Sequence, residues 1–89
     1  MAEANSGSRP VALITGASYG IGGASAEALA AQGYDLVVTD LDAASPAETV
    51  RRVEGAGGKA LALELDVCDA ASIERCLDEA FAVFGGIDV

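Results

Sequence analysis

The sequence predicts an α/β fold in which helices cover both faces of a parallel sheet, a doubly wound arrangement. Two observations lead to this expectation. Short apolar runs alternate with segments of helical periodicity, in the order β-α-β-α-β-α-β with the last strand cut short. Glycines stand where each helical segment would end. Strands that follow one another through helices run parallel, and their crossovers are right-handed.

The first strand and the first helix flank a glycine-rich turn. Residues 11–14 form an apolar run whose length and flanks indicate a buried strand. A helix is predicted over residues 20–32, with Gly33 at the position where a glycine ends a helix. Its apolar stripe is made of small residues, so it can lie close against the sheet. That predicted stripe consists of Ala24, Ala28 and Ala31, with Leu29 beside it.

The second strand is predicted at residues 34–39, and Asp40 stands at its carboxyl end. Residues 45–48, Ser-Pro-Ala-Glu, have the form of a capping box with proline at the first helical position. This pattern predicts the start of a second helix, which the glycine-rich segment 55–58 then ends.

The third strand is predicted at residues 60–65, with its three leucines on one face and Ala60, Ala62 and Glu64 on the other. The last helix is expected to begin after an N-cap at Asp69. Its apolar positions follow an amphipathic period and are Ile73, Cys76, Leu77, Ala80, Phe81 and Phe84. Residues 87–89 then have the character of an opening fourth strand.

Length and charge limit the classes of function. The 89 residues make one small domain or a piece of a larger one, and the net charge of −9 is opposite to a surface that binds nucleic acid or an anionic membrane. No apolar run approaches the roughly 20 residues that span a bilayer, and residues 1–10 lack the apolar stretch expected of a secretory signal. Histidine is absent, and Cys68 and Cys76 fit neither a disulfide scaffold nor a metal site. A cytoplasmic protein without bound metal is expected.

The turn at residues 15–22, TGASYGIG, carries the chemistry. Its glycines, Gly16, Gly20 and Gly22, permit a tight turn, a close approach of phosphate to the backbone and close packing of helix on strand. N–H groups at the helix start, aided by the helix dipole, attract an anion. The turn is therefore predicted to hold the diphosphate of a dinucleotide. A glycine-rich turn that binds nothing is the alternative.

The form T-G-x-x-x-G-I-G resembles the short-chain dehydrogenase/reductase (SDR) family, in its compact single-domain branch. Asp40, the Leu-Asp-Val at residues 65–67 and the segment 84–89 extend the resemblance over residues 11–89. The glycine spacing differs from G-x-G-x-x-G, and no Gly-Lys-Ser/Thr follows as in a P-loop. The resemblance implies a Rossmann-type doubly wound sheet, of which this chain supplies the first half and the start of strand four.

Carried over position by position, the resemblance implies ten cofactor-binding residues. They are Gly16, Ser18, Tyr19, Gly20, Ile21, Gly22, Asp40, Leu41, Asp66 and Val67. The glycine turn and the Ile21 N–H would hold the diphosphate, Asp40 the hydroxyls of the adenine ribose, and Asp66 the adenine amino group. In the alternative interpretations, Asp40 is a solvated strand end, Asp66 caps the following turn and Tyr19 is an exposed aromatic without a ligand.

Charge favours NAD over NADP as the cofactor. NADP carries an additional 2′-phosphate with a charge of about −1.5 to −2, and no basic residue lies between Arg9 and Arg51. Where NADP-preferring members of the family carry basic residues, this chain has Tyr19 and the acidic segment 40–42. Arg51 and Arg52 fall inside the second predicted helix and are not expected to turn toward the pocket. We therefore predict NAD.

No catalytic residue is assigned within residues 1–89. The resemblance implies a Ser and a Tyr-x-x-x-Lys pair beyond strand four, and neither Tyr19 nor Tyr34 has a lysine four residues on. The predicted function is NAD(H)-dependent hydride transfer between nicotinamide and a secondary alcohol or ketone. Two alternatives stay open: a 3-oxoacyl-thioester (acyl-carrier-protein) reductase using NADPH, and a non-catalytic nucleotide-binding or scaffold protein.

The predicted domain organisation is a flexible lead-in at residues 1–9, followed by the N-terminal part of an NAD-binding domain at residues 10–89. Strand one would lie beside strand four, so a stop at Val89 would leave an interior strand edge uncovered, which invites aggregation. We therefore expect the polypeptide to continue. The resemblance implies a homodimer or homotetramer for the full-length protein.

Overall fold

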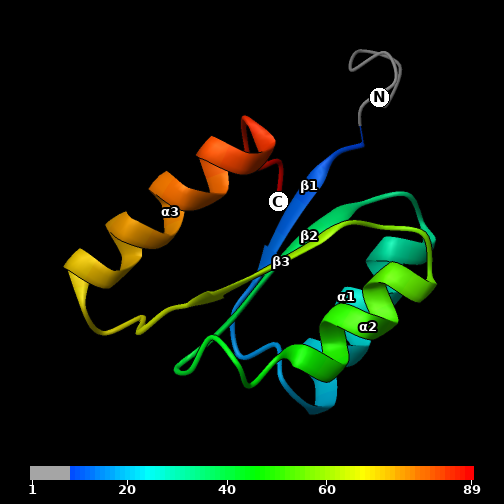
Figure 1. Cartoon of the computed structure of the whole chain (residues 1–89), viewed down its shortest axis with the longest axis horizontal. Helices are drawn as coiled ribbons and strands as arrows, with labels where there is room; N and C mark the ends of the chain where they lie inside the picture. The colour runs from blue at the N-terminus through cyan, green and yellow to red at the C-terminus, as the bar shows by residue number, and fades with distance from the viewer. Residues whose placement is uncertain (1–8) are drawn as a thin grey trace.

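A computed structural model describes residues 9–89, within which three strands and three helices alternate along the chain (Figure 1). The strands are β1 (Val11–Ile14), β2 (Asp35–Asp40) and β3 (Ala60–Glu64). The helices are α1 (Gly20–Ala31), α2 (Ala47–Gly55) and α3 (Ala70–Phe84). The predicted α/β class and the element order are confirmed. The lead-in predicted at residues 1–9 lies, apart from Arg9, outside the described residues.

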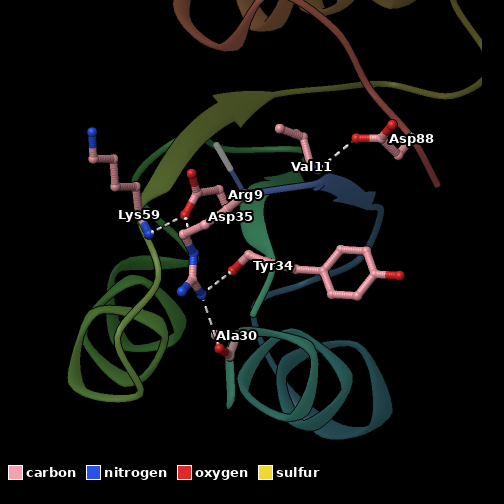
Figure 2. A network of polar contacts seen from close by, with 7 residues as sticks. All are labelled: Arg9, Val11, Ala30, Tyr34, Asp35, Lys59 and Asp88. Carbon is pink, nitrogen blue, oxygen red and sulfur yellow. Dashed lines mark hydrogen bonds and ion pairs between the residues drawn. The ribbon is translucent and has the colours of Figure 1, made fainter. Parts of the chain in front are cut away.

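The three strands form a parallel sheet in the order β1-β2-β3. The last residues of the chain add to the free edge of β1, where the Asp88 N–H donates to the Val11 carbonyl at 2.8 Å and the Leu13 N–H to the Val89 carbonyl at 2.9 Å. The Asp88 carboxylate also accepts the Val11 N–H at 2.8 Å (Figure 2). The C-terminal segment thus begins a fourth row beside β1, as predicted.

Helices cover both faces of the sheet: α1 and α2 lie on one face and α3 lies on the other (Figure 1). The core under α1 and α2 contains Ala12, Leu36 and Val38 of the sheet with Ala26, Ala30 and Val53 of the helices. The core under α3 contains Val11, Val37 and Leu63 with Cys76 and Ala80. The predicted alternation of β3 is confirmed, because its alanines pack into the first core and its leucines into the second.

The buried face of α1 differs from the predicted stripe. Ala24, Ala28 and Ala31 are exposed, and the buried residues are Gly23, Ala26 and Ala30. Because eight of the twelve positions of this helix are Ala or Gly, apolar periodicity does not single out one face. Close backbone approach selects it: a Cβ on Gly22 would lie 2.3 Å from the Gly16 carbonyl oxygen.

The helix ends agree with the sequence except at the start of α2. The carboxylate of Asp69 accepts the Ala71 N–H at 3.0 Å, which confirms the predicted N-cap of α3. Gly33, at φ 106°, ends α1 as expected. The predicted capping box is wrong, because the N-cap of α2 is Pro46, which has no side-chain acceptor. The turn before it is held by the Asp42 carboxylate, which accepts the Ala44 N–H at 2.9 Å.

The amphipathic stripe of α3 is only half buried. Cys76 and Ala80 face the sheet, whereas Ile73, Leu77 and Phe81 remain 36, 38 and 52% exposed. The buried stripe is therefore shifted to one side of the predicted apolar face. None of the helices in residues 9–89 is long and apolar enough to cross a membrane.

Arg9 joins the amino ends of the strands to α1 (Figure 2). Its Nε donates to the Asp35 carboxylate at 2.9 Å, and its Nη2 donates to the carbonyls of Ala30 and Tyr34 at 3.0 and 2.8 Å. The same Asp35 oxygen accepts the Lys59 N–H at 2.9 Å. One guanidinium thus links the starts of the strands with the C-terminal turn of α1, at the sheet end opposite to the glycine turn.

Candidate functional site

The ten residues predicted to bind a cofactor all lie at or just after the carboxyl ends of the three strands, from the last residue of β2 to the first turn of α1. The turn at residues 15–22 leaves β1, Asp40 and Leu41 end β2, and Asp66 and Val67 follow β3. Because the strands are parallel, these segments meet at one end of the sheet, at the lower left of Figure 1. The carboxyl ends of parallel strands are where ligands bind in open α/β sheets.

The glycines of the turn are required for two different reasons. Gly16 and Gly20 have φ of 60° and 57°, a left-handed conformation that other residues rarely adopt. Apart from the adjoining residues and the backbone of α1 itself, no atom of the described residues lies within 4 Å of the place where a Cβ on either would stand, so the outer side of the turn is open. Gly22 instead lies against the Gly16 carbonyl, where a Cβ has no room. The turn therefore presents bare backbone to a ligand.

The N-terminus of α1 has free hydrogen-bond donors. Its N-cap is Tyr19, and within residues 9–89 no side chain caps it and no acidic residue stands in its first turn. The first N–H groups of a helix have no partner within the helix and carry the positive end of its dipole. This end of α1 is therefore suited to an anion such as a diphosphate.

Asp40 is attached to the glycine turn. Its carboxylate accepts the Ser18 N–H at 3.2 Å and the Leu41 N–H at 2.9 Å. The pKa of Asp40 is lowered from its ordinary value of 3.8, first by the neighbouring Ser18 hydroxyl and then by the Leu41 and Ser18 N–H groups, against the opposing effect of burial. The carboxylate is therefore charged at neutral pH.

The Ser18 hydroxyl is the one buried side-chain polar atom of the described chain that has no hydrogen-bond partner. It lies near enough to Asp40 to favour the charged carboxylate, but it does not meet the geometry of a hydrogen bond. A buried polar group normally has a partner. Together with the uncapped helix and the open turn, this atom indicates that the residues present fit a polar ligand such as a dinucleotide.

The loop after β3 places Asp66 in a turn. Its carboxylate accepts the Cys68 N–H at 2.9 Å, and its own N–H donates to the Ser72 hydroxyl at 2.9 Å. This is the capping role that the sequence left open for Asp66. Large apolar side chains stand exposed around the same end of the sheet, and they are Tyr19, Ile21, Leu41 and Val67, at 60 to 87%. A bound planar or apolar group would cover these exposed side chains.

A hollow of about 340 Å³ opens beside the glycine turn. It is lined by Ser18, Tyr19, Gly20, Gly23, Ser45, Glu48 and Arg52. Arg52, which was not expected to turn toward the pocket, lines this hollow. The i,i+4 spacing in α2 brings its Nε to 3.5 Å from the Glu48 carboxylate in the same wall. Glu48 also binds Arg51, whose hydrogen bond and charge lower the pKa of Glu48.

Thr49 was not predicted to belong to the site. Its hydroxyl donates to the Ala17 carbonyl at 2.6 Å, and its side chain is buried. The feature of the sequence that could have indicated Thr49 is a hydroxyl residue on the buried stripe of α2, between Pro46 and Val53. Spacing alone does not say that this hydroxyl reaches the glycine turn.

The fold is of the Rossmann type. The family model described as short chain dehydrogenase matches residues 10–89, and the chain belongs to this family. The chain is 43% identical over 81 residues to L-2,3-butanediol dehydrogenase of Corynebacterium glutamicum, an alignment that covers 89% of this chain and 31% of that protein. It thus spans about a third of the length of the curated relatives that it matches.

Solved structures agree in fold. A short-chain type dehydrogenase/reductase from Mycobacterium marinum superimposes with a TM-score of 0.87 at 37% identity, over 91% of this chain and 32% of that one. A 3-oxoacyl-[acyl-carrier protein] reductase from Brucella melitensis, in complex with NAD, gives 0.83 at 40% identity, over 93 and 32%. A metagenomic short-chain oxidoreductase in complex with NADP gives 0.85 at 34% identity, over 92 and 37%. Both nicotinamide cofactors therefore occur among the neighbours.

Proposed function

We propose that this chain is the cofactor-binding half of an NAD(H)-dependent oxidoreductase that acts on a secondary alcohol or ketone. The observation that carries the proposal is the attachment of Asp40 to the glycine turn through the Ser18 N–H. This attachment puts a charged acceptor beside the bare backbone of the turn. The cofactor would supply the hydride chemistry. Family membership supports the oxidoreductase class.

Each part of the site has a defined task in this proposal. The N–H groups at the start of α1 hold the diphosphate, and the Asp40 carboxylate accepts hydrogen bonds from the ribose hydroxyls. Leu41 and Val67 cover the adenine with the exposed apolar side chains described above. The Asp66 carboxylate, already engaged with the Cys68 N–H, has a second oxygen for the adenine amino group. These residues bind and orient; none is assigned a catalytic step.

Electrostatics supports NAD rather than NADP. Two unit charges about 4 Å apart interact by about 4 kcal/mol at an effective dielectric of 20. If about 3 kcal/mol of repulsion between Asp40 and a 2′-phosphate remains after relaxation, NAD is preferred roughly a hundredfold. Arg52, which lies closer to the turn than expected, opposes this preference only in part, since its guanidinium is paired with Glu48.

Calorimetric titration of the full-length protein with NAD and with NADP, which measures the two dissociation constants, tests the proposal. We expect tighter binding of NAD, and Asp40→Ala should weaken NAD by about tenfold or more and abolish the preference, because both effects depend on one carboxylate. Asp42→Ala is the matched control: it removes an exposed acid whose described bond is a local one to the Ala44 N–H. Tighter binding of NADP, or unchanged NAD affinity in Asp40→Ala, would overturn the proposal.

A second candidate is reduction of a 3-oxoacyl thioester. The similarity to the Brucella melitensis reductase, 40% identical and solved with NAD, favours it. Because the glycine turn and Asp40 would serve either substrate equally, the substrate must be tested directly. Assays of the full-length protein with a small secondary alcohol and with a 3-oxoacyl thioester separate the two candidates, and a preference for the thioester would replace the first with the second.

A further inference from the structure

We propose that Thr49 of α2 is a positioning residue for the cofactor-binding turn. Its hydroxyl holds the Ala17 carbonyl, so that the free N–H groups of α1 and the Ser18 N–H keep the orientation that a dinucleotide requires. The inference rests on the proposed function, since it concerns how the same site is held. It concerns a residue that contacts the turn and not the cofactor.

The segment Ala17–Ser18 is held on three sides. The Ala17 N–H donates to the Thr39 carbonyl at 2.9 Å, and the Thr49 hydroxyl donates to the Ala17 carbonyl at 2.6 Å. The Ser18 N–H in turn donates to the Asp40 carboxylate at 3.2 Å. The Ala17 N–H and the Ser18 N–H are therefore hydrogen-bonded to β2, and the Ala17 carbonyl is hydrogen-bonded to α2. A turn held in this way before the ligand arrives loses little conformational freedom on binding.

Burial makes the Thr49 bond a strong restraint. Ala17 is fully buried and Thr49 is 2% exposed, so water cannot replace the hydroxyl. The second acceptor within reach is the Ser18 carbonyl at 3.5 Å, which also belongs to the turn. A valine at this position would fill the same space without the cost of burying a polar group. Thr49 buries a hydroxyl instead, and among residues 9–89 the acceptors of this hydroxyl lie in the cofactor turn.

Gly23 shows how closely this contact is packed. A Cβ there would lie 3.2 Å from the Thr49 hydroxyl oxygen and 3.4 Å from the Ala17 carbonyl oxygen. The first distance is shorter than an ordinary van der Waals contact, so an alanine would press against the hydrogen bond from the α1 side. Gly23→Ala and Thr49→Val therefore disturb one bond from two directions.

The test compares Thr49→Val, which keeps the shape and removes the hydroxyl, with Thr49→Ser, which keeps the hydroxyl. Dissociation constants for NAD and for ADP-ribose are measured by calorimetry on the full-length protein. We expect Thr49→Val to weaken both ligands by about tenfold and Thr49→Ser by less than about threefold, because only the valine leaves the turn carbonyl unpaired. ADP-ribose lacks the nicotinamide, so the readout is independent of turnover.

Val53→Ala is the control for a loss of stability alone. Val53 is fully buried one helical turn further along α2, in the core under α1. This variant should unfold at a lower temperature and still bind NAD within about twofold of the unaltered protein when measured well below its unfolding transition. A tenfold loss of affinity in Val53→Ala would overturn the inference, because general destabilisation would then explain the Thr49 result.

Unchanged NAD affinity in folded Thr49→Val would also overturn it. If Thr49→Val does not fold, Gly23→Ala decides: weaker NAD binding supports the inference, and unchanged binding overturns it. Failure of the unaltered protein to bind NAD, NADP and ADP-ribose would instead overturn the proposed function, and this inference with it.

Discussion

At the scale of single residues, Gly22 and Gly55 show how differently the same residue type can be required. A Cβ on Gly22 would lie 2.3 Å from the Gly16 carbonyl oxygen, a distance that real structures do not show. A Cβ on Gly55, in the last turn of α2, would meet no atom within 4 Å among the described residues. The first glycine is required by close packing of α1 on the turn, whereas the second is not required sterically.

Alanine substitution at these two glycines should therefore act in opposite directions. Gly22→Ala forces the turn and α1 apart and should lower the free energy of unfolding by about 1–3 kcal/mol or more. Gly55→Ala should raise it by about 0.4–1 kcal/mol, because alanine restricts the unfolded chain without strain in the helix. Urea unfolding of the two variants measures both changes. Similar effects of both substitutions would contradict the close contact at Gly22.

The lowered pKa of Asp40 predicts how cofactor binding depends on pH. Because the folded-state pKa lies below the ordinary value of 3.8, the contribution of Asp40 to stability is present above that value and lost as pH falls through the folded pKa. NAD affinity should accordingly stay level from neutral pH to about pH 5 and decline only below about pH 4. Dissociation constants for NAD across this range measure it.

Asp40→Asn is the control for this prediction, because an amide does not titrate. Its affinity, though weaker, should not follow the acid decline seen with the unaltered protein, after allowance for acid unfolding by circular dichroism. A decline of NAD affinity centred above about pH 5 would show that Asp40 is not the controlling group.

At the scale of elements, the Arg9 network determines how the starts of the strands are held together (Figure 2). The guanidinium donates to Asp35 of β2 and to two carbonyls, those of Ala30 in α1 and Tyr34 after it. Positive charge at the C-terminal end of α1 is also favoured by the helix dipole. Lys59 takes part through its backbone N–H and not through its side chain.

Replacing Arg9 should therefore destabilise the fold more than replacing Lys59. Arg9→Met should lower the free energy of unfolding by about 1–3 kcal/mol, because buried Asp35 loses its ion pair and two carbonyls lose a donor. Lys59→Met should change it by less than about 0.5 kcal/mol, since the backbone bond to Asp35 remains. Chemical denaturation of both variants gives the comparison. Equal losses would contradict the arrangement of the network.

The periodicity of apolar residues along a helix does not show which of those residues the sheet will bury. In α3, the amphipathic period predicts one broad apolar face, but the sheet buries Cys76 and Ala80 while Leu77 and Phe81 beside them stay exposed. Burial raises the pKa of the Cys76 thiol, with a smaller contribution from the Glu79 charge. The sequence of a helix shows which residues are apolar, but the position of the helix on the sheet determines which of them are buried.

At the scale of the whole molecule, the net charge of −9 sets the electrostatic background of the site. Asp40 is partly exposed, so its repulsion of a 2′-phosphate acts partly through water and is open to screening by salt. The preference for NAD over NADP should therefore narrow by several-fold as ionic strength rises toward about 1 M, where the Debye length is about 3 Å.

This salt effect is measured as the ratio of the two dissociation constants at low and high salt. Asp40→Ala serves as the control, because a site without the carboxylate should show a much smaller change in the ratio. A preference that does not respond to salt would point to steric exclusion of the 2′-phosphate rather than to charge repulsion.

Much of the fold and of the candidate site could be predicted from the sequence. The strand ranges, the N-cap at Asp69 and the alternating faces of β3 depend on short-range patterns. The structure agrees with them, with the ends of β2 and β3 shifted by one residue. The ten candidate site residues lie at or just after the carboxyl ends of the strands, which a parallel sheet must bring to one end. Their binding role stays a prediction. The buried face of α1 and the place of Arg52 could not be predicted in this way.

The order of the elements, the glycine turn and the acidic character of its surroundings follow from the amino-acid sequence alone, because backbone preference, apolar periodicity and charge are properties of neighbouring residues. Which face of the alanine-rich α1 is buried, and that the Thr49 hydroxyl meets the Ala17 carbonyl 32 residues away in the chain, is visible in the folded chain and not in the local pattern. Such contacts depend on how closely helix, turn and sheet pack. Glycine and alanine permit that close approach without indicating its direction.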